Sequence, residues 1–141
     1  MALIVVLLAA PRGKSGIMPQ RLYDAADRGD AAAVAEFLRE GDDANEAAND
    51  WAPLHVACFK GHFDAVKALL DGGADVGQAK NDGATPLHMA CQNGHVDVVR
   101  LLIEKDADVG QADCLRQTPL DVAKAKDHQD VARLLLSLIH I

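Results

Sequence analysis

Residues 13–15, Gly-Lys-Ser, come closest to a motif that could do chemistry, because they follow the apolar run of residues 4–10. A phosphate-binding loop needs an earlier glycine, five residues before the second one, so that consecutive backbone N–H groups can surround a phosphate. Leu8 occupies that position. Gly16 and Pro19 also disfavour the helix whose N-terminus should face the phosphate. The spacing therefore predicts no nucleotide site, and we expect no cofactor.

Histidines are the next candidates, as ligands of a metal ion. Five of the six recur at a spacing of 33 residues, His55 and His88 in one series and His62, His95 and His128 in another. Equivalent positions in stacked units lie about 8–10 Å apart, the spacing of packed helices. A zinc ion needs its ligands within about 2.0–2.3 Å. We therefore expect these imidazoles to connect loops through hydrogen bonds and not to bind metal.

Cysteines and acidic residues do not complete a catalytic site. The three cysteines are odd in number and lack a CxxC spacing, so neither a disulfide framework nor a zinc knuckle is indicated. Cys58 and Cys91 are one repeat apart, too far for a disulfide, and are expected to be small buried apolar residues. Cys114 falls in a predicted loop tip and is the thiol expected to be most reactive. Acidic pairs such as Asp42 and Asp43 flank turns, and we predict that the chain is not an enzyme.

Composition favours one helical domain. The 141 residues, half of them apolar, suffice for a sizeable core. Only five residues are Phe, Trp or Tyr, which favours helices over a barrel. The net charge of −7 argues against nonspecific binding to nucleic acid or an anionic membrane, which needs clustered Lys and Arg. Because the cysteines are expected to be reduced and no N-x-S/T acceptor occurs, we expect the protein in the cytoplasm or nucleus. We also expect a monomer, without nucleic acid or membrane partners.

A repeat of 33 residues organises the chain. The stretch APLHVACFKGH of residues 52–62 recurs twice at that spacing, as TPLHMACQNGH and as TPLDVAKAKDH. Aligned without a gap, residues 50–82 and 83–115 are identical at 16 of 33 positions. A more divergent copy, LYDAADRGD, begins at Leu22. We therefore predict four units, which comprise residues 18–49, 50–82, 83–115 and 116–136.

Each unit is expected to form a helix, a turn, a second helix and an extended loop, as the third unit illustrates. Thr85 can cap the first helix, and Pro86 tolerates the first helical position. Gly94 ends that helix, because glycine adopts positive φ at no steric cost. A second helix is predicted from Val96 to Glu104, with an inward apolar face of Val98, Val99, Leu102 and Ile103. Neither helix is long enough to be stable alone, so each pair must pack against its neighbours.

These motifs resemble the ankyrin repeat: T-P-L-H, A-C-x-x-G-H, V-V-x-L-L and G-A-D-V, most specifically in the second and third units. The resemblance implies an all-α fold, an ankyrin-repeat solenoid of stacked helix-turn-helix units with projecting β-hairpin-like loops. It also implies a protein-binding surface without chemistry of its own. Three positions depart from the pattern: Ala52 replaces the threonine, Asp121 replaces the histidine, and Asp106 replaces a helix-exit glycine such as Gly73. We expect Asp106 to hold a positive φ at a modest cost.

Positions that vary between units are candidates for contact with a partner. One set, Trp51, Ala84 and Gln117, is placed at the loop tips, and a second set, Phe59, Gln92 and Ala125, follows the apolar stripe of the first helix. Both sets are expected to face solvent. Trp51 and Phe59 suggest an aromatic anchor, since interface hot spots are enriched in aromatic residues; the alternative is that they pack on neighbouring loops and serve stability only.

The predicted binding surface is the concave face formed by loop tips and first helices. Its candidate residues are Trp51, Phe59, Lys60, Gln92, Asn93, Asp27, Arg28, Leu115, Gln117 and Lys126. The first functional hypothesis is a non-enzymatic adaptor or scaffold that presents this surface to a protein partner. The alternative is a targeting fragment of a larger enzyme or channel whose active domain is missing from this chain.

Both ends are expected to lie outside the repeat domain of residues 18–136. Residues 1–17 are interpreted as a disordered extension or as an upstream region translated in frame, since Met18 opens the first unit directly. A signal peptide is disfavoured, because the run lacks a basic n-region and is short. The last helix is expected to end near Leu135 or Leu136. The apolar tail of residues 137–141 belongs to LSLIHI, which matches one frame of a transposon end used in DNA sequencing, and on that interpretation the protein continues past Leu135.

Overall fold

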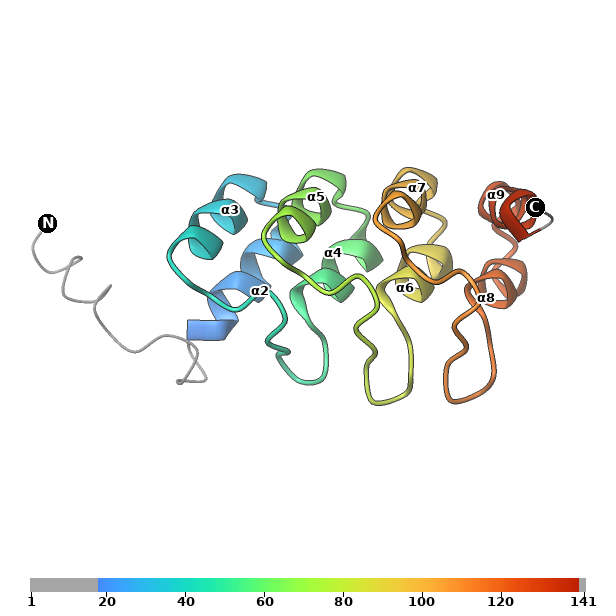
Figure 1. Ribbon diagram of the computed structural model, residues 1–141, viewed down its shortest axis with the longest axis horizontal. Coiled ribbons are helices and arrows are strands. Elements are labelled where there is room, and N and C mark those ends of the chain that lie inside the picture. Colours follow the sequence, from blue (N-terminus) through green and yellow to red (C-terminus); the bar gives the residue numbers. More distant parts are fainter. Residues whose placement is uncertain (1–17, 140–141) are drawn as a thin grey trace, which may run out of the picture.

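The computed structural model describes residues 18–139, which form eight helices in four helix-turn-helix pairs (Figure 1). The predicted extension of residues 1–17, with its Gly-Lys-Ser stretch, lies outside the described residues, as do residues 140–141. The first helices of the pairs are α2 (Met18–Arg28), α4 (Pro53–Lys60), α6 (Pro86–Gln92) and α8 (Pro119–Ala125). The second helices are α3 (Ala31–Arg39), α5 (Phe63–Asp71), α7 (Val96–Glu104) and α9 (Gln129–Ile139).

The helices form two layers. The first helices α2, α4, α6 and α8 pack side by side in chain order, and the second helices α3, α5, α7 and α9 form a row above them (Figure 1). The long loops between successive pairs project from the layer of first helices. The described part of the chain contains no strand. The prediction of an all-α solenoid of stacked helix pairs is confirmed.

The core lies between the two layers and is built from equivalent positions of successive units. Leu54 and Leu87 are 1% exposed, and Leu69 and Leu102 are fully buried. Burying a leucine side chain of this kind stabilises the fold by about 1.5–3 kcal/mol. No pair can bury these residues alone, so every internal unit depends on both neighbours.

The orientation of α7 differs slightly from the prediction. Val98, Val99 and Leu102 are fully buried as expected. Ile103 is only half-buried, whereas Leu101, which was not assigned to the inner face, is buried. The stacked units cover α7 on two sides, and this coverage widens its buried face beyond the single stripe that a helical period predicts.

Helix boundaries follow the predicted signals. Proline occupies the first turn of α4, α6 and α8, and the hydroxyl of Thr85 accepts a hydrogen bond from the N–H of His88 at 3.4 Å. Gly94 follows the end of α6 with a φ of +72°. The predicted second helix from Val96 to Glu104 is confirmed.

The last helix is longer than predicted. α9 ends at Ile139 and not near Leu135 or Leu136. No glycine or proline interrupts this stretch, and the hydroxyl of Ser137 donates to the carbonyl of Leu134 at 2.7 Å, a bond that is compatible with a helix. No described helix is both long and apolar enough to cross a membrane.

The loops between pairs are closed by backbone hydrogen bonds and are called hairpin loops here. The N–H of Lys80 donates to the carbonyl of Ala84 at 2.9 Å, and the N–H of Asp113 donates to the carbonyl of Gln117 at 2.9 Å. In the first hairpin loop, Ala48 and Trp51 exchange two such bonds. Each loop therefore returns on itself like a β-hairpin, although its paired segments are too short to count as strands.

Candidate functional site

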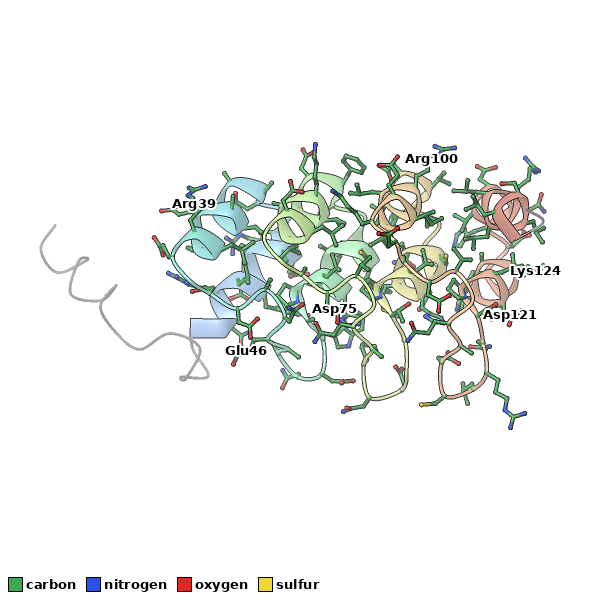
Figure 2. All side chains as sticks on the ribbon, in the orientation of Figure 1. Arg39, Glu46, Asp75, Arg100, Asp121 and Lys124 are labelled. Atoms are coloured by element: carbon green, nitrogen blue, oxygen red, sulfur yellow. The ribbon has the colours of Figure 1, made fainter. Side chains whose placement is uncertain are left out.

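The concave surface consists of the hairpin loops and the first helices α2, α4, α6 and α8. Figure 2 shows Glu46 and Asp75 toward the hairpin loops, while Arg39 and Arg100 lie on the layer of second helices. Asp121 and Lys124 lie on α8 at the end of the stack. The concave surface and the surface of the second helices are therefore built from different elements.

A first histidine series holds two of the three hairpin loops, each against the first helix of the preceding unit. The backbone N–H of Thr85 donates to Nδ1 of His88 at 3.0 Å, so the neutral ring carries its proton on Nε2. Nε2 then donates to the carbonyl of Gln117 in the next hairpin loop at 2.8 Å. His55 repeats this arrangement with the N–H of Ala52 and the carbonyl of Ala84, and its burial lowers its pKa.

A second histidine series connects each turn to the preceding unit. Nε2 of His95 lies 3.0 Å from the carbonyl oxygen of Phe59, and Nε2 of His128 lies 2.9 Å from that of Gln92. His62 makes the same contact with the carbonyl of Asp27. The expectation that histidines connect loops through hydrogen bonds is confirmed. Among the described residues, no group of His, Cys, Asp or Glu is arranged to hold a metal ion.

An aromatic cluster in the second unit occupies part of the concave surface. The rings of Trp51 and Phe59 meet edge to face, with centroids 5.5 Å apart, and Trp51 also contacts the ring of His55. Nζ of Lys80 lies 4.4 Å from the centre of the Trp51 ring. Trp51 and Phe59 are both half-buried. The two predicted anchor residues thus form one unit, and a cation of the same chain covers one of its faces.

Polar candidates beside the aromatic cluster are already bonded within the chain. Nζ of Lys60 lies 3.2 Å from a carboxylate oxygen of Asp27, and the side-chain amide of Asn93 donates to the carbonyl of Phe59 at 2.6 Å. Arg28 is exposed and lies 4.0 Å from Asp30. The contacts of Lys60 with Asp27 and of Asn93 with Phe59 therefore join neighbouring units along the concave surface, whereas Arg28 and Asp30 belong to the same unit.

A groove of about 390 Å³ lies between the third and fourth units, where hairpin loops meet α6 and α8. Four candidate residues line it: Gln92, Leu115, Gln117 and Lys126. Leu115 is 78% exposed, the most exposed large apolar side chain in the described part of the chain. The structure therefore gathers the candidates into two areas, the aromatic cluster and this groove.

The three residues that were expected at the loop tips, Trp51, Ala84 and Gln117, are partly or fully buried. Ala84 is 5% exposed, and Trp51 and Gln117 are half-buried, so the expectation that this set faces solvent at the loop tips is wrong. These residues instead close the base of each hairpin loop, while the tips are formed by residues such as Gly83 and Arg116. Hairpin closure places Ala84 and Gln117, two residues before their first helices, against the preceding unit, where their carbonyls contact His55 and His88.

Several groove residues were not among the candidates. Asp82 and Asp113 come from adjacent hairpin loops, and Met89 and Val122 come from α6 and α8. Met89 and Val122 each directly follow the four-residue motif that starts the first helix, TPLH or TPLD, and they differ from each other. That variation between units could have identified this position as a candidate for contact with a partner. The carboxylate of Asp82 accepts the N–H of Ala84, a bond that lowers its pKa.

The thiols lie in the buried and exposed positions that the repeat predicts for them. Cys58 and Cys91 are fully buried, and burial raises the pKa of the Cys91 thiol to about 12. Cys114 is exposed beside the tip of the third hairpin loop. Its backbone N–H donates to the carbonyl of Asp82 at 2.9 Å, which holds the two adjacent hairpin loops together.

Comparison with known families agrees with this geometry. A family model described as ankyrin repeats (3 copies) matches residues 22–113 and also residues 73–141. The two matches together span both layers of helices and the hairpin loops.

Proposed function

This chain belongs to the ankyrin-repeat family, whose members are generally protein–protein interaction modules, and we propose that it is an adaptor or scaffold that binds a protein partner through its concave surface. The observation that carries this proposal is the open groove between the third and fourth units, beside the exposed side chain of Leu115. An exposed apolar side chain next to a preformed groove is the usual arrangement of an interface anchor.

The aromatic cluster is the second part of the proposed surface. Trp51 and Phe59 occupy the positions that Ala84 and Gln92 occupy in the third unit. Their rings contact each other edge to face, which fixes their orientation. Rigid aromatic side chains add contact area at a low cost in conformational entropy. The candidate residues therefore surround two contact areas on one continuous surface.

The remaining properties are part of the same proposal. Family members are typically non-enzymatic, and we assign no reaction to this chain. A cytoplasmic or nuclear location is supported by the free cysteines, and a monomer by the scarcity of exposed large apolar residues, which are Phe63 and Leu115 in the described part of the chain. The net charge of −7 supports a protein and not a nucleic acid as the partner.

The test is affinity capture with the full chain, followed by binding measurements on the partner that it identifies. Trp51→Ala with Phe59→Gln installs the sister residues on the concave surface. Phe63→Val does the same on α5 and serves as the matched control, because Phe63 is an exposed aromatic residue in the layer of second helices. The proposal predicts that the first variant loses the partner and the second retains it.

Melting temperatures separate binding from folding. Loss of binding with an unchanged melting temperature supports the aromatic anchor. Retained binding with a lowered melting temperature assigns Trp51 and Phe59 to stability alone. A partner lost through Phe63→Val, and through no substitution on the concave surface, contradicts the proposal.

A further inference from the structure

The groove exists because of a difference between two equivalent places in the repeat. Of the residues that line it, Ala84, Gln92 and Asp113 have equivalents 33 residues earlier in Trp51, Phe59 and Lys80. In that earlier place the two aromatic rings and the stem of Lys80 fill the angle between hairpin loop and first helix. Between the third and fourth units, the smaller side chains of Ala84, Gln92 and Asp113 leave the equivalent space unfilled, and this space is the groove.

The equivalent space between the second and third units shows which kind of side chain can occupy this position of the repeat. The side chain of Lys80 is only 10% exposed, and its ammonium lies 4.4 Å from the centre of the Trp51 ring and 3.6 Å from a carboxylate oxygen of Asp82. A lysine thus lies with its stem on a nonpolar surface and its charge on an aspartate. The chain itself supplies the cation in this unit.

In the open groove, the corresponding cation is replaced by an acid. Oδ1 of Asp113 accepts the N–H groups of Leu115 and Gln117, each at 2.9 Å, which fixes the carboxylate at the base of the hairpin loop. Oδ2 of Asp113 has no hydrogen-bond partner among the described residues, and no cation of residues 18–139 pairs with it. Asp82, from the adjacent hairpin loop, also lines the groove.

We infer that this groove receives a lysine or arginine side chain of the protein partner. The stem lies along Val122 and Ala125, and the charge pairs with Asp113 and Asp82. Leu115 covers an apolar residue next to that basic residue in the partner sequence. Lys126, at the C-terminal end of α8, disfavours the opposite orientation, in which the cation points away from the hairpin loops. This inference rests on the proposed function and specifies the chemistry of the partner.

The probe is a library of random dodecapeptides displayed on phage and selected on the immobilised full chain. Selection is repeated on Asp82→Asn with Asp113→Asn. Asparagine retains the side-chain oxygen that accepts the backbone N–H groups, so the hairpin loops keep their hydrogen bonds. The matched control is Asp75→Asn with Asp108→Asn, since these exposed aspartates also accept a backbone N–H at 2.9 Å but do not line the groove.

The inference predicts peptides with Lys or Arg next to an apolar residue. Their affinity falls about tenfold or more on the groove variant and stays unchanged on the control, although both variants lose two negative charges. Equal losses on both variants indicate attraction to net charge alone and overturn the inference. Selected peptides that depend on Trp51 and Phe59 but not on Asp82 and Asp113 also overturn it, while the proposed protein-binding function stands. A selection without any peptide that prefers the unaltered groove likewise overturns it, and the capture experiment then tests the proposed function independently.

Discussion

The imidazole of His88 connects two units of the solenoid, because its Nδ1 accepts the N–H of Thr85 at 3.0 Å while its Nε2 donates to the carbonyl of Gln117 at 2.8 Å. The first bond closes the start of α6, and the second holds the next hairpin loop in place. The side chain of Asp121, the equivalent residue in the fourth unit, accepts the N–H of Thr118 at 3.0 Å and makes no other hydrogen bond within residues 18–139. The two functions of the histidine can therefore be separated.

We predict that His88→Asn destabilises the domain by about 1–3 kcal/mol, because asparagine can cap α6 but is too short to reach Gln117. Urea unfolding monitored by circular dichroism measures the effect. His88→Ala, which removes both bonds, should cost more. Equal unfolding midpoints for His88→Asn and the unchanged chain contradict the connecting role.

Stability should fall on mild acidification through His55. Burial lowers the pKa of His55 in the folded chain below the ordinary 6.5, although its hydrogen bonds to the backbone of Ala84 and Gln78 oppose this shift. Of the nearby charges, Lys80 lowers the pKa further and Asp50 raises it. As the pH falls below 6.5, His55 takes up a proton in the unfolded chain but not yet in the folded chain. The folded state is therefore fully stable above pH 6.5, and its free energy of unfolding decreases between pH 6.5 and the lower pKa of the folded state. The slope from this residue is at most about 1.4 kcal/mol per pH unit.

Urea midpoints at about pH 7.5 and about pH 5.5 measure this loss. His55→Asn lacks the titrating group, so its stability should change less between the two values, although it is lower at both. The same pH dependence in both proteins excludes His55 as a source of acid sensitivity.

Asp106→Gly should stabilise the domain. Asp106 has a φ of +71°, a conformation that glycine adopts without cost, and Gly73 occupies the equivalent position with a φ of +102°. We expect a gain of about 0.5–1 kcal/mol. The reciprocal control is Gly73→Asp, where a new Cβ meets no atom within 4 Å, so only backbone strain is added. Unfolding midpoints that do not move in opposite directions contradict this explanation.

Gly94→Ala should destabilise the domain more than Gly73→Ala. Both glycines have positive φ, but a Cβ at Gly94 would lie 2.5 Å from Nδ1 of His128, whereas the space around Gly73 is open. The difference between the two variants, about 1–3 kcal/mol in unfolding free energy, measures the close approach of the histidine ring to the turn. Equal losses attribute the whole effect to backbone conformation.

Arg21→Lys should cost about 1–3 kcal/mol. The guanidinium donates two hydrogen bonds of 2.8 Å to Asp42, whose side chain is 3% exposed, and stacks 4.2 Å from the centre of the Phe37 ring. Lysine cannot reproduce this planar contact. Arg28→Lys is the control, because Arg28 is 59% exposed and only 4.0 Å from Asp30, and its unfolding midpoint should hardly change. Equal effects of the two substitutions contradict a special role for Arg21.

Features set by local sequence could be predicted, and so could the histidine contacts that recur with the repeat. Burial that depends on how a hairpin loop closes on its neighbour could not. The Thr85 cap and the helix from Val96 to Glu104 follow from residues within one unit. The burial of Ala84 depends on how its hairpin loop closes on the preceding unit. The groove was harder still to predict from the sequence, because it results from the small size of Ala84 and Gln92 relative to Trp51 and Phe59. Only the stacked structure shows that these positions enclose a common space.

The most direct test of the protein-binding account is to map a bound peptide on the full chain by NMR. Amide chemical shifts are recorded with and without a peptide selected on the unaltered chain. The account predicts that the perturbed amides lie in the hairpin loops and in α4, α6 and α8, with the largest shifts around Asp113 and Leu115. Shifts confined to α3, α5, α7 and α9, on the opposite layer, would contradict it.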